Sequence, residues 1–296
     1  MRILITGASG MLGATLVDNF SNKYNIFATS RSNFSNNKAH KFMEFDLLND
    51  SYKNLISWSK PEIIIHCAAI TNLDYCEQNE QIAREVNTES LAKIMEYSKN
   101  ARIIFISSDA VFQDGLKLPN ENSVTIPQNV YGKSKLQGEK ILLNSAHPHL
   151  ALRTTIVGRN INYHSKYSFL EWLIESLKNK EEITLFKDAI FNPITIWDFS
   201  NELDWIINNK IEGVFHLSGR EIISKYDFGM KICNALGFDL SLIKVGYLDE
   251  QLFKAKRNKD QTLDSSRYQV YSNRKLPTIN QTIKYITKYF KESYYE

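Results

Sequence analysis

The sequence of 296 residues contains few cysteines, and the three that it has, Cys67, Cys76 and Cys233, follow no regular spacing. A disulfide framework needs an even set of cysteines and a structural zinc site needs four closely spaced ligands, so neither is expected. Unpaired thiols persist in a reducing compartment. The cysteine content therefore predicts a cytoplasmic protein.

Long apolar runs and an excess of one charge are also missing. No run approaches the roughly 20 residues that span a bilayer, and a first strand that starts at Arg2 leaves no room for a signal peptide. The 36 basic and 33 acidic residues give a net charge of +3, whereas nucleic-acid and membrane-surface binders concentrate positive charge. Neither a nucleic acid nor a membrane is therefore expected as a partner.

A glycine-rich turn stands between an apolar run and a helical pattern at the start of the chain. Residues 2–5 are apolar, and Thr-Gly-Ala-Ser-Gly-Met-Leu-Gly follows at residues 6–13. Apolar residues then recur at helical spacing from Leu12 to Phe20. Strand, glycine turn and helix are the setting in which a dinucleotide pyrophosphate meets backbone N–H groups and a helix N-terminus. The pattern predicts a dinucleotide site, and a glycine-rich turn without a ligand is the alternative.

The end of the second predicted strand, residues 25–29, lacks the acidic residue that an NAD enzyme places near the ribose hydroxyl groups. Ser30, Arg31 and Ser32 follow it instead. A guanidinium flanked by hydroxyl donors suits a 2′-phosphate. Arg31 and Ser32 therefore predict NADPH as the cofactor, with NADH as the alternative; a solvated loop arginine would carry no preference.

Strand and helix patterns alternate through the first half of the chain and become less regular after Thr155. Such alternation predicts a parallel sheet with helices on both faces. The predicted fold is α/β, with a Rossmann-type doubly wound parallel sheet in residues 1–155, to which residues 191–217 return. A smaller C-terminal α/β substrate-binding region would occupy residues 156–296. Strands are predicted at residues 40–45, 62–66, 102–106, 149–153, 183–186, 214–217 and 242–245, and helices at residues 51–59, 78–99, 131–143, 169–178, 197–208, 224–236 and 279–290.

The stretch from Ser107 to Glu139 carries the residues for a proton-donating site. Ser108 follows the strand predicted at residues 102–106, and Tyr131 and Lys135 are four residues apart, on one face of the following helix. A lysine charge at that spacing is expected to lower the pKa of the phenol from about 10. The serine hydroxyl can hydrogen-bond a substrate oxygen. Taken alone, the tyrosine–lysine spacing is also typical of an ordinary helix surface.

Several stretches occur together in an order that resembles the extended short-chain dehydrogenase/reductase superfamily. They are Thr6 to Gly13, Asp46-Leu47, Cys67-Ala68-Ala69, Ser107-Ser108-Asp109 and Tyr131 to Lys135. Residues 68–74, 108–115 and 127–139 further resemble the dTDP-4-dehydrorhamnose reductase group, which reduces the 4-keto group of a nucleotide-linked 6-deoxyhexose with NADPH or NADH. The likeness is dense in the first half and scattered beyond Thr155, as at residues 192–195 and 263–264.

The resemblance implies a role for each matching residue. Tyr131 would protonate the carbonyl oxygen, Lys135 would bind the nicotinamide ribose and hold down the pKa of the phenol, and Ser108 would polarise the carbonyl. The implied cofactor contacts are Gly7, Ser9, Gly10, Met11, Leu12, Gly13, Arg31, Ser32, Asp46, Leu47, Cys67, Ala68, Ala69, Thr71, Lys135 and Thr154. The implied substrate contacts are Ser108, Asp109, Ala110, Val111, Tyr131 and Arg257. For Arg257, which could grip a diphosphate, a solvated charge run is the alternative.

The departures from the family pattern bear on the substrate and on metal binding. Nucleotide-sugar dehydratases carry a Glu where this chain has Ala110, which counts against dehydratase chemistry. Some family members dimerise through magnesium held by a Glu near the position of Thr15, so no metal is predicted, and a homodimer is an assembly that the family allows. The usual Trp is missing from residues 152–158, and a Pro is missing after Arg257. The sugar therefore stays open.

Two other functions stay open on the same fold. The regulatory subunit of some methionine adenosyltransferases resembles this reductase group, keeps the tyrosine–lysine spacing and acts through its partner. An epimerase would form product with no net consumption of cofactor. The resemblance favours a nucleotide-sugar reductase.

Overall fold

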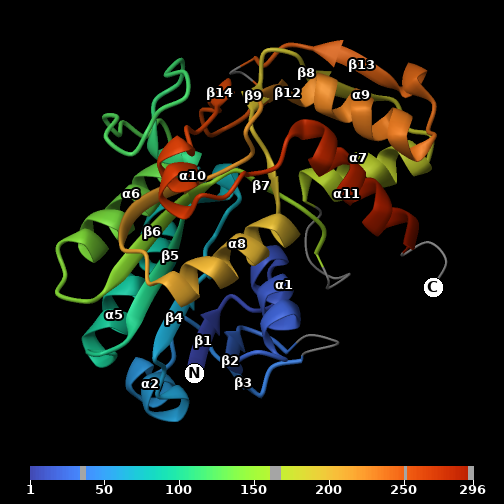
Figure 1. Cartoon of the computed structure of the whole chain (residues 1–296). Coiled ribbons are helices and arrows are strands. Elements are labelled where there is room, and N and C mark those ends of the chain that lie inside the picture. Colours follow the sequence, from blue (N-terminus) through green and yellow to red (C-terminus); the bar gives the residue numbers. More distant parts are fainter. Residues whose placement is uncertain (34–37, 161–167, 250–251, 293–296) are drawn as a thin grey trace.

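The computed structural model describes residues 1–33, 38–160, 168–249 and 252–292, and a seven-stranded sheet forms its centre (Figure 1). The strand order is β11-β6-β5-β4-β1-β2-β3, and all neighbouring strands are parallel. The predicted doubly wound α/β fold is thereby confirmed. The seven strands are β1 (Arg2–Thr6), β2 (Asn25–Ser30), β3 (Lys41–Glu44), β4 (Ile63–His66), β5 (Arg102–Ser108), β6 (His149–Thr154) and β11 (Gly213–Leu217).

Helices cover both faces of this sheet. Successive side chains of a strand point to opposite faces, so each strand contributes to the apolar layer on either side. Ile3 and Ile5 pack in one apolar cluster with Leu16 of helix α1 (Met11–Phe20). Leu4, between them, packs in a second cluster with Leu55 of helix α2 (Tyr52–Ser59). Burial on both faces explains why these strands are continuous apolar runs rather than alternating patterns.

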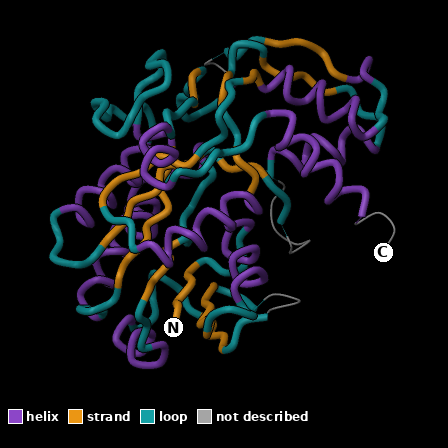
Figure 2. The backbone as a smooth tube through the Cα atoms, viewed as in Figure 1, coloured by secondary structure: helices purple, strands orange, loops and turns teal. Residues whose placement is uncertain are grey.

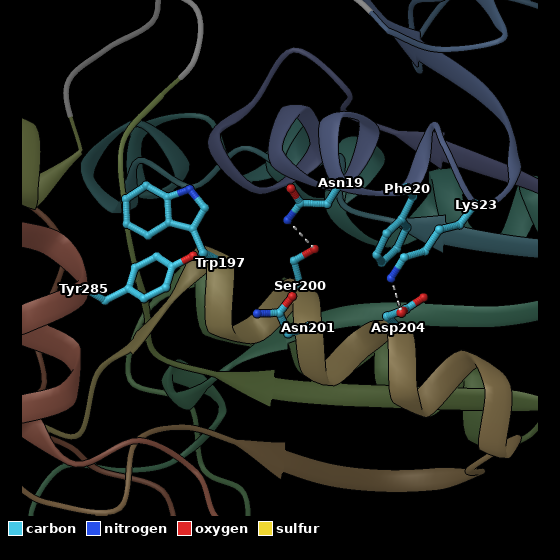
Figure 3. Close-up of a pocket in the computed structure, with 8 residues that line it drawn as sticks. All are labelled: Asn19, Phe20, Lys23, Trp197, Ser200, Asn201, Asp204 and Tyr285. Carbon is cyan, nitrogen blue, oxygen red and sulfur yellow. Dashed lines mark hydrogen bonds and ion pairs between the residues drawn. The ribbon is translucent and has the colours of Figure 1, made fainter. Parts of the chain in front are cut away.

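Helix α8 (Ile196–Asn209) lies on α1 and brings the late strand β11 back to the large sheet. Figure 3 shows the contact between the two helices: Asn19 Nδ2 donates to Ser200 Oγ at 3.0 Å, and Lys23 Nζ pairs with Asp204 Oδ2 at 2.6 Å. The hollow in that view has none of the predicted site residues in its lining. This contact fixes one part of the second half of the chain to the first helix.

The strands of two small sheets lie in the upper part of the view in Figure 1, and Figure 2 shows how short most of them are. The small sheets have the orders β12-β9-β14, β13-β8 and β10-β7. Their strands are β7 (Ile156–Val157), β8 (Ile183–Phe186), β9 (Ile190–Phe191), β10 (Ile194–Thr195), β12 (Ile223–Ser224), β13 (Ile243–Gly246) and β14 (Asp260–Gln261). The other helices are α3 (Leu73–Gln78), α4 (Glu80–Arg84), α5 (Ser90–Tyr97), α6 (Val130–Leu143), α7 (Phe169–Lys178), α9 (Lys225–Leu236), α10 (Ser266–Ser272), α11 (Ile279–Glu292), the π-helix η1 (Glu85–Glu89) and the 3₁₀ helices η2 (Asp109–Val111) and η3 (Leu240–Leu242).

The helix predicted at residues 78–99 differs from the one observed. Asn79 has φ −134° and separates α3 from α4, and the π-turn η1 interrupts the run between α4 and α5. The prediction of one regular helix was therefore wrong in its middle. A π-turn adds one residue to a helical turn and often marks a functional site. Within the described residues, no helix combines the length and apolar character that a bilayer crossing requires.

Candidate active site

The glycine turn after β1 is shaped by how closely the backbone passes its neighbours. Gly7 has φ +68°, a conformation that other residues rarely adopt, and a Cβ placed there would lie 2.6 Å from Ala68 Cα. A Cβ on Gly13 would lie 2.2 Å from the Gly7 carbonyl oxygen. Both positions therefore exclude side chains, and they bring the start of α1 against the loop that follows β4.

The N-terminus of α1 fits the pyrophosphate of a dinucleotide. Gly10 is its N-cap, no side chain caps the first turn, and Gly10 is exposed while Ser9 is half-buried. A helix N-terminus of this kind presents backbone N–H groups and a partial positive charge to an anion. Met11, Leu12 and Gly13 belong to this first turn, as predicted from the sequence. Their contacts with a cofactor stay a prediction.

Arg31 and Ser32 lie exposed after β2, and Asp46 lies close by after β3. The Asp46 carboxylate accepts hydrogen bonds from Leu48 N at 3.0 Å and from Asn49 Nδ2 at 2.9 Å. These bonds lower the pKa of Asp46, and the charge of Arg31 lowers it further. The hydrogen bonds of the Asp46 carboxylate thus stabilise the turn that Asp46 begins. Arg31 is exposed beside Asp46, where the sequence predicts that a 2′-phosphate binds.

Asn87 is fully buried and fixes the loop after β4. Its Oδ1 accepts from Ile70 N at 2.7 Å, and its Nδ2 donates to Ile70 O at 3.1 Å and to Ser134 Oγ at 3.0 Å. Asn87 lies in η1, so the π-turn directs this amide towards both the loop and α6. Ala68, in the same loop, donates its N–H to Thr6 Oγ1 at 3.3 Å, whereas Thr71 is exposed.

A close helix contact brings Tyr131 to Ser108. Asn129 caps α6 by accepting a hydrogen bond from Gly132 N at 2.8 Å. A Cβ on Gly132 would lie 2.1 Å from the Ala110 carbonyl oxygen, so only glycine lets α6 pack against η2. The first turn of α6 therefore lies directly on the turn that follows β5. The sequence did not identify Gly132 as the reason for this approach.

The electrostatics around Tyr131 differ from the expectation. Burial raises the pKa of Tyr131, the charge of Asp109 raises it further, and hydrogen bonding with Ser108 only partly opposes the rise. The expectation that Lys135 lowers the pKa of this phenol was therefore wrong. The effect of burial on this pKa is larger than that of any hydrogen bond or nearby charge. A raised pKa keeps the phenol protonated at neutral pH, which suits a proton donor.

Lys135 lies inside the protein beside the end of β5. It is 2% exposed, and its Nζ lies 4.0 Å from the centre of the Phe105 ring. Burial lowers the pKa of Lys135 to about 7, and the charge of Glu139 opposes this shift. Burial also raises the pKa of Cys67 to about 12, so this thiol stays protonated. Near neutral pH, Lys135 can gain or lose its charge.

A buried ion pair holds α6 against the large sheet. Arg153 on β6 binds both carboxylate oxygens of Glu139, with Nη2 2.7 Å from Oε2 and Nε 2.9 Å from Oε1. Ser107 Oγ donates to the same carboxylate. Such bidentate pairs fix geometry as well as charge. The pair thus ties helix α6 to β5 and β6.

Three residues that were predicted to contact the cofactor or the substrate use their side chains for contacts within the protein. Val111 has no exposed surface and packs in a cluster with Leu263, so its side chain is a core group rather than a substrate contact. The Thr154 hydroxyl donates to Leu217 O at 2.7 Å. Arg257 pairs with Asp74 at 2.7 Å, which leaves its proposed contact with a diphosphate dependent on its other N–H groups.

Residues 255–263, the late segment, bind several parts of the site that lie far away in the sequence. Ala255 N donates to Asp74 Oδ1 at 2.9 Å, and Lys256 O accepts from Asn129 Nδ2 at 2.9 Å. Asn258 Nδ2 donates to Phe112 O at 2.9 Å. Only Arg257 and Leu263 had drawn attention in the sequence, because irregular segments have no periodic signal.

A parallel dinucleotide-binding sheet with Ser108, Tyr131 and Lys135 gathered at the end of β5 defines the extended short-chain dehydrogenase/reductase class. Within this class, the chain belongs to the family described as the RmlD substrate binding domain, whose model matches residues 1–291. The family resemblance drawn from the sequence is thereby confirmed.

Individual relatives include reductases and a subunit of another enzyme. A dTDP-4-dehydrorhamnose reductase of Aggregatibacter actinomycetemcomitans is 32% identical over 247 residues, which cover 78% of this chain and 78% of that protein. The methionine adenosyltransferase 2 subunit beta of Danio rerio is 29% identical over 252 residues, which cover 81% of this chain and 75% of that protein. Two of the three kinds of protein considered from the sequence, the reductase and the regulatory subunit, are therefore among the relatives.

Solved structures share the fold over nearly the whole chain. A dTDP-4-dehydrorhamnose reductase of Clostridium acetobutylicum has a TM-score of 0.83 at 26% identity and covers 98% of this chain and 100% of its own. The dTDP-4-dehydrorhamnose reductase of Bacillus anthracis, solved in complex with NADP, has a TM-score of 0.85 at 24% identity and covers 96% of this chain and 98% of its own. At 24% identity the second likeness concerns the fold.

Proposed function

We propose that the protein is an NADPH-dependent reductase of the 4-keto group of a nucleotide-activated 6-deoxyhexose. The observation that carries the proposal is Tyr131, a phenol kept protonated by burial beside Ser108 at the end of β5. The reductase of Aggregatibacter actinomycetemcomitans, at 32% identity, supports the substrate class. NADH is the alternative cofactor, and Arg31 and Ser32 favour NADPH.

The proposed reaction adds a hydride to the carbonyl carbon and a proton to the carbonyl oxygen. Bound NADPH supplies the hydride. Tyr131 gives its phenolic proton to the oxygen, and the resulting phenolate regains a proton from solvent. Lys135 in its charged form stabilises that phenolate, and Ser108 holds the oxygen in place. Proton donation of this kind contributes about 10²–10⁴ in rate, and positioning the ketone contributes much of the remainder.

The other features expected from the sequence belong to the same proposal. The pyrophosphate would lie on the first turn of α1, and the substrate would lie between the end of β5 and the second half of the chain, whose division near residue 155 we also propose. Cys67, Cys76 and Cys233 are free thiols, which suits the cytoplasm. A homodimer is one assembly compatible with the family.

A regulatory subunit is the second candidate, and the 29% identity to the methionine adenosyltransferase 2 subunit beta of Danio rerio favours it. Such a protein would use the dinucleotide site without turnover. A half-buried Tyr131 whose raised pKa keeps it protonated beside Ser108 suits a site that donates a proton rather than one that only binds. We therefore rank the reductase first.

The test is the loss of NADPH absorbance over time with a freshly generated dTDP-4-keto-6-deoxyhexose, with and without a 3,5-epimerase. We expect oxidation that requires the sugar and that falls at least a hundredfold in Tyr131→Phe. Tyr97→Phe, at an exposed tyrosine, is the matched control and should keep full activity. Tight NADPH binding without oxidation would favour the regulatory candidate, and unchanged turnover in Tyr131→Phe would refute the mechanism.

A further inference from the structure

Lys225, which the sequence did not single out, begins helix α9 at a position fixed by the small sheets. Ser224, the last residue of β12, caps the helix by accepting a hydrogen bond from Asp227 N at 2.9 Å. Lys225 N donates to Ala189 O at 2.8 Å, and Ser224 pairs with Ile190 in the β12–β9 ladder. The backbone of Lys225 is therefore held against β9.

Two aromatic rings set the position of the Lys225 ammonium group. Its Nζ lies 3.4 Å from the centre of the Phe191 ring and 4.9 Å from the centre of the Phe169 ring. Phe191 is itself packed edge-to-face on Phe228, with ring centres 5.3 Å apart. A lysine that stacks on rings keeps a defined place, and its N–H groups can still donate to other partners.

The small sheet links Lys225 to the turn that begins at Asp109, the residue after Ser108: Ile190 pairs with Ser224 and with Asp260, and Asp260 N donates to Asp114 Oδ1 at 2.9 Å. Burial raises the pKa of Asp109 and lowers that of Lys225, and the charge of each group opposes the shift of the other. They make no ion pair at 4.0 Å or less. Asp109 comes from the first half of the chain and Lys225 from the second. The two charges therefore belong to the two parts of the chain between which we propose that the substrate lies, and Asp109 directly follows Ser108.

Asp109 already accepts one hydrogen bond, and this orients it. Ser108 Oγ donates to Asp109 Oδ1 at 2.9 Å. The second carboxylate oxygen is then the place where another donor would bind. A carboxylate accepts and an ammonium donates, whereas a sugar hydroxyl does both, so one hydroxyl or two adjacent hydroxyls match this pair of charges.

We propose that Lys225 and Asp109 bind the ring hydroxyl groups of the sugar that lie next to the carbonyl carbon, with Lys225 donating and Asp109 accepting. The inference rests on the proposed function and deepens it, because it assigns the residues that orient the hexose. Lys225 is then a substrate-binding residue carried by α9. It explains why a long cationic side chain is stacked on two rings beside the end of β5.

The test compares Lys225→Met with Lys187→Met. Methionine keeps the length and apolar stem of lysine without its charge, and Lys187 is an exposed lysine whose Nζ lies 5.6 Å from the Tyr226 ring. For Lys225→Met we expect the KM for the keto sugar to rise about tenfold to a hundredfold, the magnitude of a lost charged hydrogen bond. The Kd of NADPH and the unfolding temperature should match those of Lys187→Met.

A binding measurement separates this inference from the proposed function. With NADP⁺ present, titration calorimetry would give the affinity of the wild type and of Lys225→Met for dTDP and for dTDP-glucose. We expect the variant to lose the extra affinity for dTDP-glucose and to keep that for dTDP. A wild type that reduces the keto sugar, with a Lys225→Met variant indistinguishable from Lys187→Met, would overturn the inference and leave the reductase standing.

Two further outcomes complete the test. A wild type that neither reduces the sugar nor distinguishes dTDP-glucose from dTDP would refute the proposed function, and the inference would fall with it. A drop in unfolding temperature for Lys225→Met that Lys225→Arg restores, with the KM unchanged in both, would show a structural role for the charge and would also overturn the inference.

Discussion

Ser108 Oγ donates a hydrogen bond of 2.9 Å to Asp109 Oδ1. The single hydroxyl proton of Ser108 thus points at a neighbouring carboxylate, although the sequence suggests that it polarises the substrate ketone. A hydroxyl oxygen bonded in this way can still accept hydrogen bonds. In the proposed reaction, Ser108 can therefore hold the substrate oxygen by donation only after its proton turns away from Asp109, and Tyr131 supplies the proton to that oxygen.

Burial makes Asp109 a source of pH-dependent instability. Burial raises the pKa of Asp109 from 3.8 to about 6, against the hydrogen bond of Ser108 and the charge of Lys225. A pKa that is higher in the folded than in the unfolded state gives stability that is fully present below about pH 4 and is lost as the pH rises through about 6. Ionised Asp109 thus costs stability at neutral pH.

We therefore expect Asp109→Asn to be more stable than the wild type by about 1–3 kcal/mol at pH 7.5 and equal to it near pH 4, since each pKa unit corresponds to about 1.4 kcal/mol. Urea unfolding at the two pH values measures the difference. Asp239→Asn is the control with the opposite sign, because hydrogen bonds from Ser241 lower the pKa of exposed Asp239. Equal stability of Asp109→Asn and wild type at pH 7.5 would contradict the prediction.

Arg31 should decide the choice of cofactor. We expect Arg31→Ala to weaken NADPH binding about tenfold to a hundredfold, because hydrogen bonds to a charged group contribute about 1.5–3 kcal/mol, and to leave NADH binding unchanged. Fluorescence titration with each cofactor measures both constants. Arg84→Ala removes an exposed arginine paired with Glu89 and should change neither. Equal weakening of both cofactors would remove the role given to the 2′-phosphate.

Gly132 should be intolerant of any side chain. In Gly132→Ala the new Cβ would lie 2.1 Å from the Ala110 carbonyl oxygen, so α6 must move away from η2. We expect a loss of about 1–3 kcal/mol in unfolding free energy and a larger relative loss of kcat, because Tyr131 moves with the helix. Lys133→Ala, at the exposed neighbouring position, is the control. Full activity in Gly132→Ala would show that the contact does not position Tyr131.

Removing one partner of the buried Glu139–Arg153 pair should destabilise the protein strongly. In Glu139→Ala the Arg153 charge stays buried without its carboxylate, which typically costs about 3–5 kcal/mol. Chemical denaturation compares this variant with Lys140→Ala, at the exposed next residue of the same helix. A loss below 1 kcal/mol would mean that water reaches Arg153 in the variant.

The large sheet and the outline of the site were predictable because their signals are local. Apolar runs marked the buried strands, and the glycines after β1 and the Tyr131–Lys135 spacing each lie within a short stretch of sequence. The strands β9, β12 and β14 have two residues each, too few to show any alternation. Elements of that length depend on tertiary contacts and not on their own pattern.

Properties that depend on contacts between distant residues could not be predicted. The raised pKa of Tyr131 follows from burial by several elements, and the motif shows only the lysine next to it. Lys225 lies on the Phe191 ring because β12 pairs with β9, and no spacing in the sequence reports that pairing. The π-turn at Asn87 is equally invisible, since its apolar residues fit a regular helix over each single turn.

The contacts of the late segment impose an order on how the protein can become active during synthesis. Tyr131 and Lys135 leave the ribosome well before residues 255–263, yet that segment accepts a hydrogen bond from the cap residue Asn129 and donates hydrogen bonds to Phe112 O and to Asp74 of α3. A nascent chain therefore carries its chemical groups long before their surroundings are complete. Maturation of the site is tied to the synthesis of the late segment, when the sheet behind it is already able to form.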